Sequence, residues 1–449
     1  MTRKALTTFT LLAVLLASLA ACSSGGNGGN NGSSSPADNK GSGSGGSSDA
    51  EKVTIKMMHL WPDGSNSSQN KLVKQIIKEY EEANPGVTIK TEVLENEQYK
   101  NKLKVLSASN SLPDVGFTWA AGFLEPYVKG NLFAPLDDLL EGDLNGQFVA
   151  GTTEAYAIEE KTYALPVELN IVPVFYNKAI FEKHNLEAPK TYEEFKHVIK
   201  TLRENSVTPV ALGAKDAWTG SFWYMYLADR LGGPDLLDES IASQTFQDPK
   251  LIEAAKLAQE LVDLGAFVKG FNGLSNEEAK SEFMNEQAAM YAMGTWEVPN
   301  YTTAEDVDQA FKDKIGFFKF PVMEGGGGSL NNWVGGPGVG LFVAENSPVK
   351  EQAKDFVSFF VQKWGEKSVT EAGIFPATKV DTSTIDLPPM FIDLLNELNN
   401  ADKVTLYVDV QMKPVASEEH HNQIQALFGK AVTPEEFAKK HEEVLKAGK

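Results

Sequence analysis

Strand and helix patterns alternate at the start of the globular part of the chain, and this alternation strongly limits the folds open to it. The apolar run from Val53 to Trp61 is typical of a buried strand. Apolar residues at helical spacing follow between residues 72 and 80, and Val87 to Leu94 alternates like a strand. A second helix, with Tyr99 on its apolar face, leads to a third strand from Pro113 to Phe117. This order predicts βαβ units and hence an α/β fold with parallel strands.

A second α/β pattern begins near Ile171. Ile171 to Tyr176 is typical of one strand, and the helix after it begins near Thr191, with Glu194 as the acid of a capping box. Later helices are expected over Leu251–Leu264, Lys350–Trp364 and Pro434–Leu445. About 400 residues follow Ala50, well beyond the roughly 250–300 at which a single core stops growing, so we expect two lobes.

The first residues are typical of a bacterial secretion signal. Basic Arg3 and Lys4 precede an apolar run from Phe9 to Leu19, and small residues lead to Cys22, the only cysteine in the chain. We therefore expect a signal peptide over residues 1–21 and a lipid chain on Cys22, in the manner of a lipobox. The alternative is an ordinary secretion signal beside an incidental cysteine.

Residues 22–50 have the composition of a linker. After Cys22 they consist mainly of Ser, Gly and Asn and offer almost no apolar side chain to a core, which predicts a disordered tether. A flexible coil of this length spans roughly 30 Å, so the tether would hold the globular part just outside a membrane anchored through Cys22.

The net charge of −20 excludes several partners. An acidic surface with no basic stripe disfavours nucleic acid and anionic lipid. No motif calls for a cofactor, and His420 and His421, which adjoin acids, are expected to be a surface pair and not metal ligands because neighbouring helix residues point in different directions.

Several segments together resemble the extracellular solute-binding proteins of bacterial carbohydrate ABC importers, such as the maltodextrin and raffinose binders. They are Leu165–Lys178, Phe283–Met290, Gly294–Trp296, Gly335–Gly338 and Thr433–Glu436, and they occur in the order that these proteins share. The resemblance implies a two-lobed periplasmic-binding-protein-like fold with three crossings between the lobes.

The same resemblance implies where the lobes divide. The crossings are expected near Glu168 to Val172, Gly336 to Gly340 and Phe375 to Ala377. The N-terminal lobe would then comprise residues 51–168 and 340–378, and the C-terminal lobe residues 169–339 and 379–449.

A sugar site needs flat aromatic rings for the C–H faces of the ligand and polar groups for its hydroxyls. In the first lobe, Trp61, Glu95 and Trp119 fall at the carboxyl ends of predicted strands, where α/β sheets bind ligands. The alternatives are that a tryptophan closes the core of the lobe and that Glu95 is a solvated loop acid.

In the second lobe, the resemblance implies Asp216 and Trp218 as an acid and ring pair, and Trp296 as the main stacking ring. Gly294 beside Trp296 is expected to let a ligand approach the backbone. Asn170 lies in the expected first crossing and could bond the ligand from the floor of the cleft, and Trp333 either lines the cleft or seats a hinge. Asp409 is a weaker candidate, because its region differs most from the proteins of the family. Trp223 and Trp364 are expected in the core, since each lies on a probable helix among large apolar residues.

The resulting hypothesis is a membrane-anchored extracellular binding protein that captures a carbohydrate, most simply an oligosaccharide, by lobe closure. It would act as a monomer and deliver the ligand to the transmembrane subunits of an ABC permease. One alternative is a binding protein for a non-carbohydrate solute. The other is a secreted glycoside hydrolase, which needs two carboxylates across one bond. Glu95 and Asp216 would lie on opposite lobes, and no further feature of the sequence raises the pKa of one acid or supplies a nucleophile.

Overall fold

The computed structural model describes residues 52–448. The expected signal peptide (1–21), the acylation of Cys22 and the tether (22–50) lie outside the described residues. Within residues 52–448, no helix combines the length and apolar character needed to cross a membrane. The described residues belong to one compact unit.

The first sheet contains the predicted βαβ units. Its strands follow the order β2-β1-β3-β13-β6, with β1 parallel to β2 and β3, and β13 antiparallel to β3 and β6. The bounds are β1 (Val53–His59), β2 (Val87–Val93), β3 (Val115–Thr118), β6 (Leu165–Pro166) and β13 (Gly340–Val343). The prediction of three strands joined by two helices is therefore confirmed, and β13 joins the sheet from a distant part of the chain.

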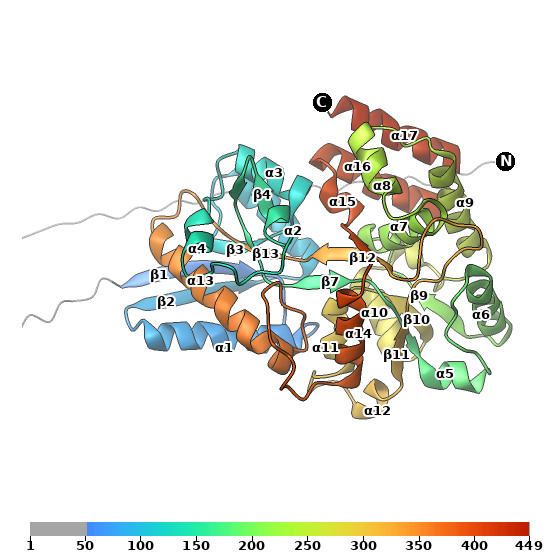
Figure 1. The fold of residues 1–449 in the computed structure, drawn as a ribbon, viewed down its shortest axis with the longest axis horizontal. Helices are drawn as coiled ribbons and strands as arrows, with labels where there is room; N and C mark the ends of the chain where they lie inside the picture. The colour runs from blue at the N-terminus through green and yellow to red at the C-terminus, as the bar shows by residue number, and fades with distance from the viewer. Residues whose placement is uncertain (1–51, 449) are drawn as a thin grey trace, which may run out of the picture. The chain divides into compact units, whose positions relative to one another are not determined.

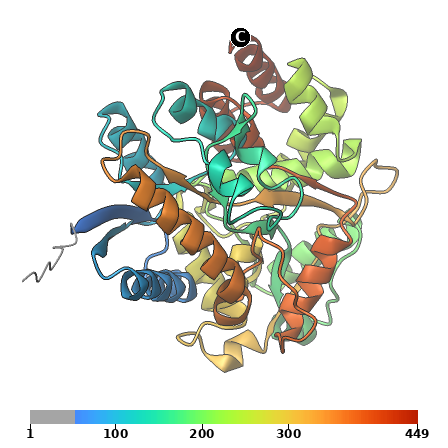
Figure 2. The same cartoon turned by 60° about the vertical axis from the view of Figure 1, so that its left-hand side comes forward.

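The helices associated with this sheet are α1 (Ser67–Ala83), α2 (Asn96–Ala108), α3 (Ala121–Lys129), α4 (Asp137–Glu141) and α13 (Lys350–Lys367). Helix α13 lies against α1 and β13, as Figure 2 shows for the orange helix beside the blue one. A short antiparallel ribbon, β4 (Ala157–Ile158) with β5 (Lys161–Thr162), precedes β6.

A second sheet has the order β11-β8-β10-β9, with β10 parallel to β9 and β8 antiparallel to β10 and β11. Its strands are β8 (Val174–Asn177), β9 (Thr208–Ala211), β10 (Ala288–Ala292) and β11 (Ile315–Phe318). The helices that follow β8 and β9 are α5 (Lys178–Lys183), α6 (Tyr192–Glu204), α7 (Trp218–Gly232), α8 (Leu236–Ser243), α9 (Pro249–Asp263) and α10 (Asn276–Met284). The capping box of Thr191 and Glu194 is present at the start of α6, as predicted.

A third, connecting sheet contains β7 (Leu169–Ile171), β12 (Asn332–Pro337) and β14 (Lys403–Thr405), in the order β14-β12-β7. Strands β7 and β12 run between the two larger sheets, as Figure 1 shows, and β14 pairs with β12. The prediction of one strand over Ile171 to Tyr176 is wrong, because β7 ends at Ile171 and β8 begins at Val174 in a different sheet. Pro173 lies in the break between the two strands. Because proline has no backbone N–H, it cannot donate a hydrogen bond to a neighbouring strand.

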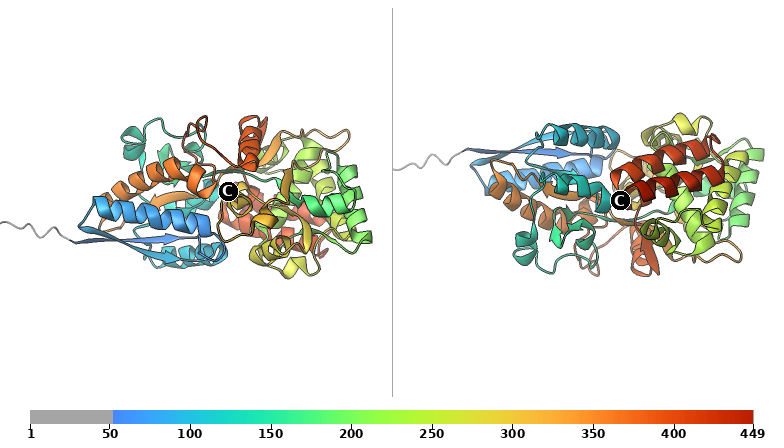
Figure 3. Two further views of the ribbon diagram at one scale, coloured as in Figure 1. Left: turned by 90° about the horizontal axis from the view of Figure 1, so that it is seen from below. Right: turned by 90° about the horizontal axis from the view of Figure 1, so that it is seen from above.

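The remaining helices are α11 (Val298–Tyr301), α12 (Gln309–Lys312), α14 (Pro389–Asn399), α15 (Val408–Gln411), α16 (Pro414–Phe428) and α17 (Pro434–Ala447). Helices α16 and α17 pack side by side, as the right-hand view of Figure 3 shows, and both contact α9. Thr433 caps α17 and forms a capping box with Glu436. Helix α15 contacts α3, so the end of the chain lies close to elements of the first sheet.

Candidate functional site

A cavity of about 660 Å³ lies between elements of the first sheet and elements of the later part of the chain. This volume falls within the roughly 300–1,000 Å³ typical of small-molecule sites. Of the predicted site residues, the cavity is lined by Trp61, Glu95, Trp119, Trp218, Trp296 and Asp409. Asn170, Asp216 and Trp333 are not part of its wall. The cavity therefore gathers residues that lie far apart in the sequence, and their contact with a ligand stays a prediction.

Trp61 follows β1 and is mostly enclosed by protein. Only 4% of its surface is exposed, one ring face stacks on Trp364 at 4.9 Å, and it meets the Phe117 ring edge-on at 4.8 Å. Trp61 thus closes the core of the first lobe and also forms part of the cavity wall. The prediction that Trp223 and Trp364 lie in the core is confirmed, since each is 1% exposed.

Four rings from elements after β8 form a continuous aromatic wall. Trp218, at the start of α7, lies 6.2 Å from Trp296, and Phe222, one turn further along α7, lies 6.3 Å from the same ring. Tyr407 completes the group at 6.3 Å from Trp296 and 5.5 Å from Phe222. All these contacts are tilted or edge-on, which is the arrangement that aromatic quadrupoles favour.

Gly294 supports this wall in a way that the sequence did not indicate. A Cβ at this position would lie 2.1 Å from Cζ3 of Trp296, so the space beside the glycine is filled by the Trp296 ring. The absence of a side chain at Gly294 makes room for the Trp296 ring, and the approach of a ligand to this backbone stays a prediction.

Two of the predicted acids have defined partners. Glu95 caps α2, and its carboxylate accepts a hydrogen bond from the Glu97 N–H at 3.1 Å. Asp409 Oδ2 lies 3.1 Å from Nε2 of His421 on α16. Burial opposes ionisation of Asp409, but the hydrogen bond and charge of His421, helped by Lys100, lower the pKa of Asp409 to about 2. Asp409 is therefore a carboxylate at neutral pH.

Asp216 lies behind the wall. Its Oδ2 accepts a hydrogen bond from the Asn276 N–H at 2.7 Å, so it positions the start of α10, whose residues Asn276 and Glu277 do line the cavity. Burial, together with the negative charges of Glu97 and Glu95, raises the pKa of Asp216. Burial also raises the pKa of Glu277, with Glu297 and Glu95 adding to the shift.

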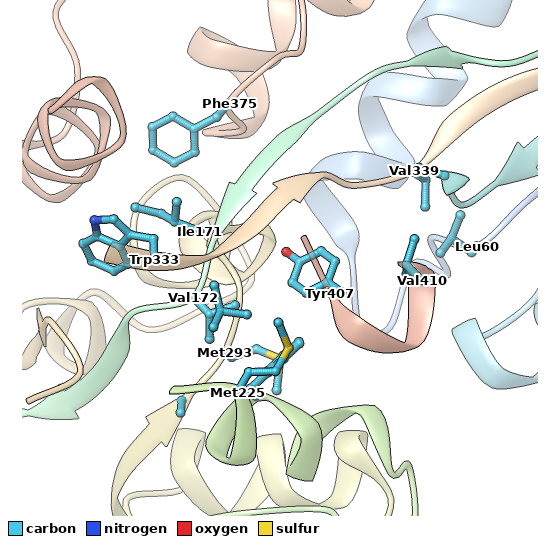
Figure 4. Close-up of a cluster of buried hydrophobic side chains, with 14 of the residues drawn as sticks. Leu60, Ile171, Val172, Met225, Met293, Trp333, Val339, Phe375, Tyr407 and Val410 are labelled. Carbon is cyan, nitrogen blue, oxygen red and sulfur yellow. The ribbon is translucent and has the colours of Figure 1, made fainter. Parts of the chain in front are cut away.

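Asn170 and Trp333 belong to the connecting sheet. Asn170 is fully buried on β7, and its Oδ1 accepts a hydrogen bond from Thr295 Oγ1 at 2.9 Å. Trp333 on β12 is 2% exposed. In Figure 4, Trp333 lies with Ile171 and Phe375 at one end of the buried cluster, whereas Leu60, Val339 and Val410 of the cavity wall lie at the other. Trp333 was expected either to line the cleft or to pack at the second crossing, and its placement favours packing at the crossing.

Several wall residues were missed by the sequence analysis, among them Glu97, Lys100, Glu168, Tyr407 and His421. Glu97 and Lys100 could have been predicted from the sequence. They lie in the first turns of the helix after β2, at the same edge of the sheet as the predicted residue Glu95. Glu168 lies in the expected first crossing. Tyr407 and His421 come from the C-terminal region, from which only Asp409 was predicted, and no local pattern indicates which of its side chains reach the cavity.

The expectation of a surface histidine pair is wrong for His420. Its side chain is fully buried, with Nε2 at 2.7 Å from Ser221 Oγ and Nδ1 at 2.8 Å from Nε2 of His441. His421, the next residue, faces the cavity. The two rings do point apart, as predicted for neighbours on a helix. Within the described part of the chain, no group of three or more His, Cys, Asp or Glu side chains is placed to hold a metal ion.

Comparisons with known proteins agree with this architecture. Residues 64–363 match the model of the family described as bacterial extracellular solute-binding protein. The multiple sugar-binding protein of Streptococcus mutans is 26% identical over 330 residues, which cover 69% of this chain and 71% of that protein.

Two solved structures show how far the fold is shared. One, from work on xylan utilization by Caldanaerobius polysaccharolyticus, is 31% identical, with a TM-score of 0.81 over 87% of this chain and 99% of the other. A chitin oligosaccharide binding protein, 24% identical, has a TM-score of 0.80 over 88% of this chain and 98% of its own. The predicted two-lobed α/β fold is confirmed, and because the family model covers more than half of the sequence, the chain belongs to the bacterial extracellular solute-binding proteins.

Proposed function

We propose that this protein is the substrate-binding component of an ABC importer and captures an oligosaccharide between its lobes. The observation that carries the proposal is the set of tryptophans that line one cavity from different elements, namely Trp119 after β3, Trp218 on α7 and Trp296 after β10. Aromatic rings take the C–H faces of a sugar, and the carboxylates beside them accept hydrogen bonds from its hydroxyls.

The relatives support a carbohydrate ligand. The S. mutans protein is named for binding multiple sugars, and a Bacillus subtilis relative, 22% identical over 389 residues, is named for melibiose, raffinose and stachyose. An oligosaccharide fits better than a monosaccharide, because the rings are distributed along the wall. Among oligosaccharides, we favour raffinose-type or xylan-derived ones, because of these names and the work in which the 31% identical structure was solved.

The connecting sheet supports the proposed lobe boundaries. The chain passes from β6 in the first sheet to β7 and then β8 in the second, and it returns through β12 to β13. Near the third crossing, the Leu169 N–H donates to the Phe375 carbonyl, and the Ala377 N–H donates to the Val167 carbonyl. These contacts fit lobes of residues 51–168 with 340–378 and 169–339 with 379–449, which rotate about the three connections.

The delivery step rests on family membership. A ligand that touches both lobes binds the closed form better than the open one, and it shifts the population by that difference in affinity. The permease would recognise the closed form. Anchoring through a lipid on Cys22 and a monomeric state complete the proposal, and they rest on the sequence analysis.

The first experiment measures intrinsic tryptophan fluorescence and calorimetric binding of the chain from Ser23 to Lys449. The panel contains raffinose, stachyose, xylo-oligosaccharides, chitin oligosaccharides and monosaccharides, with chromatography for products. Saturable binding of one oligosaccharide class, with no product formed, supports the proposal. Trp296→Ala should weaken that binding at least tenfold, whereas the buried control Trp223→Phe should not.

Two outcomes would replace this function. Binding of no sugar would favour the non-carbohydrate solute, and slow hydrolysis of a sugar would favour the glycoside hydrolase. Membership of a solute-binding family disfavours the hydrolase in advance.

A further inference from the structure

A lysine side chain lies against two of the tryptophans that the proposed function assigns to the ligand. Nζ of Lys100 on α2 is 4.9 Å from the centroid of the Trp119 ring and 5.7 Å from the centroid of the Trp218 ring. The two rings come from opposite lobes under the proposed division. The Lys100 side chain is 21% exposed and forms part of the cavity wall. Both distances fall within the roughly 6 Å at which a cation interacts with an aromatic face.

Glu97 holds this arrangement in place. Its Oε1 accepts a hydrogen bond from Lys100 Nζ at 3.0 Å and another from Nε1 of Trp218 at 3.1 Å. One carboxylate oxygen therefore anchors both the ammonium group and the indole ring across the cavity. Burial raises the pKa of Glu97, but the charge of Lys100 and the hydrogen bonds from Lys100 and Trp218 outweigh burial, so the net pKa is lowered.

An ammonium group and a sugar compete for the same kind of surface. The electron-rich face of an indole attracts a cation and also the polarised C–H groups of a pyranose. Trp119 also contacts Phe123 edge-on at 5.0 Å and Tyr99 at 6.1 Å, so several sides of its ring are already occupied by protein. A ligand that stacks on Trp119 or Trp218 therefore approaches through the region that Lys100 occupies.

We propose that Lys100 is a specificity-determining residue whose ammonium group is an internal occupant of the Trp119–Trp218 pair, and that a ligand must displace it to use those rings. This inference rests on the proposed function. A short ligand that contacts only the Trp296 end of the wall leaves Lys100 in place. A longer one reaches the pair and loses part of its binding free energy in displacing the ammonium group from the rings and from Glu97.

The test compares Lys100→Ala with Lys90→Ala, a matched control at an exposed lysine on β2. Calorimetry is carried out with the longest and the shortest sugar that bind the unmodified protein. Lys100→Ala should tighten binding of the longer sugar by about 2- to 30-fold, the factor that corresponds to a cation–π interaction of ~0.5–2 kcal/mol. It should leave the shorter sugar unchanged, and Lys90→Ala should change neither. Lys100→Arg, which keeps a cation able to stack on the rings, should bind no better than the unmodified protein.

A second readout follows the lysine itself. In the ligand-free protein, ring currents from two indoles should shift the Lys100 side-chain methylene resonances upfield, and saturation with the longer sugar should return them towards ordinary values. Unchanged affinity in Lys100→Ala would overturn the inference, as would weaker binding, which would show that the ammonium group bonds to the ligand. Failure of the unmodified protein to bind any sugar would instead overturn the proposed function.

Discussion

The indole rings of Trp61 and Trp364 stack on one another, with their centroids 4.9 Å apart and their planes 15° from parallel. Trp364 lies on α13, more than 300 residues after β1, and also stacks on Phe360 at 5.6 Å. Trp364, which lies in the core and not in the cavity wall, thus supports Trp61, which does form part of the wall. Substitutions at Trp364 should therefore affect both stability and binding.

We expect Trp364→Ala to lower the free energy of unfolding by about 3–5 kcal/mol, because it leaves a large cavity beneath Trp61. It should also weaken ligand binding under conditions where the variant remains folded. Trp223→Ala removes an equally buried ring from α7, and it should cost similar stability without disturbing Trp61. Denaturant unfolding and calorimetry measure the two effects, and equal affinity in the two variants would contradict the coupling.

Gly294→Ala should weaken ligand binding by displacing the Trp296 ring, since a Cβ would lie 2.1 Å from Cζ3 of that ring. Because an overlap of this size requires a side-chain or backbone shift costing about 1–3 kcal/mol, some loss of stability should accompany it. The control is Gly273→Ala, where no atom lies within 4 Å of the added Cβ. Fluorescence titration with the identified sugar should show at least a tenfold loss for Gly294→Ala alone.

Glu168 should make stability depend on pH near neutrality. Its Oε2 is buried without a protein hydrogen-bond partner, and burial raises the pKa of Glu168 to about 7, although the Val339 N–H and the Asn170 amide oppose the rise. The folded state therefore binds more protons than the unfolded state between about pH 4.5 and 7. The contribution of Glu168 to the free energy of unfolding falls as pH rises through that window, by up to about 3 kcal/mol.

The variant Glu168→Gln isolates this contribution, since the amide does not titrate. Glu168→Gln should match the stability of the unmodified protein near pH 4.5 and exceed it at pH 8. The titratable groups near Glu168 are the phenols of Tyr156 and Tyr407, whose pKa values are raised by burial. Urea unfolding at several pH values gives the difference. A difference that does not vary with pH would show that Glu168 is ionised throughout.

The buried histidines should make stability depend on pH in the opposite direction, so that it falls as the pH is lowered. Burial lowers the pKa of His441 to about 4 and holds the pKa of His420 well below its ordinary value, so both rings are neutral at pH 7. The Nδ1–H of His441 donates to the Phe437 carbonyl at 2.8 Å, so Nε2 of the neutral His441 ring accepts from His420 Nδ1, and His420 Nε2 accepts from Ser221. Because both rings take up a proton less readily in the folded state than in the unfolded state, stability should fall as pH drops from about 6.5 towards 4.

His420→Leu tests this chain of hydrogen bonds. At pH 7 this substitution leaves a polar group unpaired on both Ser221 and His441. Each should lower the free energy of unfolding by about 1–3 kcal/mol. The substitution should also reduce the loss of stability at acid pH. His197→Leu, at an exposed position on α6, should change neither quantity by more than about 0.5 kcal/mol. If the stability of His420→Leu still falls at acid pH as much as that of the unmodified protein, the fall does not arise from His420.

Local signals in the sequence predicted the elements of the fold well. The βαβ start follows from apolar spacing between Val53 and Phe117, and the capping boxes at Thr191 and Thr433 involve only residues three positions apart. The candidate site was predicted in part for the same reason. Trp61, Trp119 and Glu95 follow strands of one parallel sheet, and the ends of such strands meet at one edge.

The sequence alone therefore determined the element types, the strand-end tryptophans and, by resemblance, the two-lobed fold. Only the tertiary structure decided which side chains share the cavity. It placed Trp333 in the connecting sheet, filled the space at Gly294 with the Trp296 ring, and brought Tyr407 and His421 from the end of the chain to the wall. Periodicity and capping depend on contacts within a few residues, whereas the placements of Trp333, Tyr407 and His421 depend on how segments more than 100 residues apart pack together, which no local pattern contains.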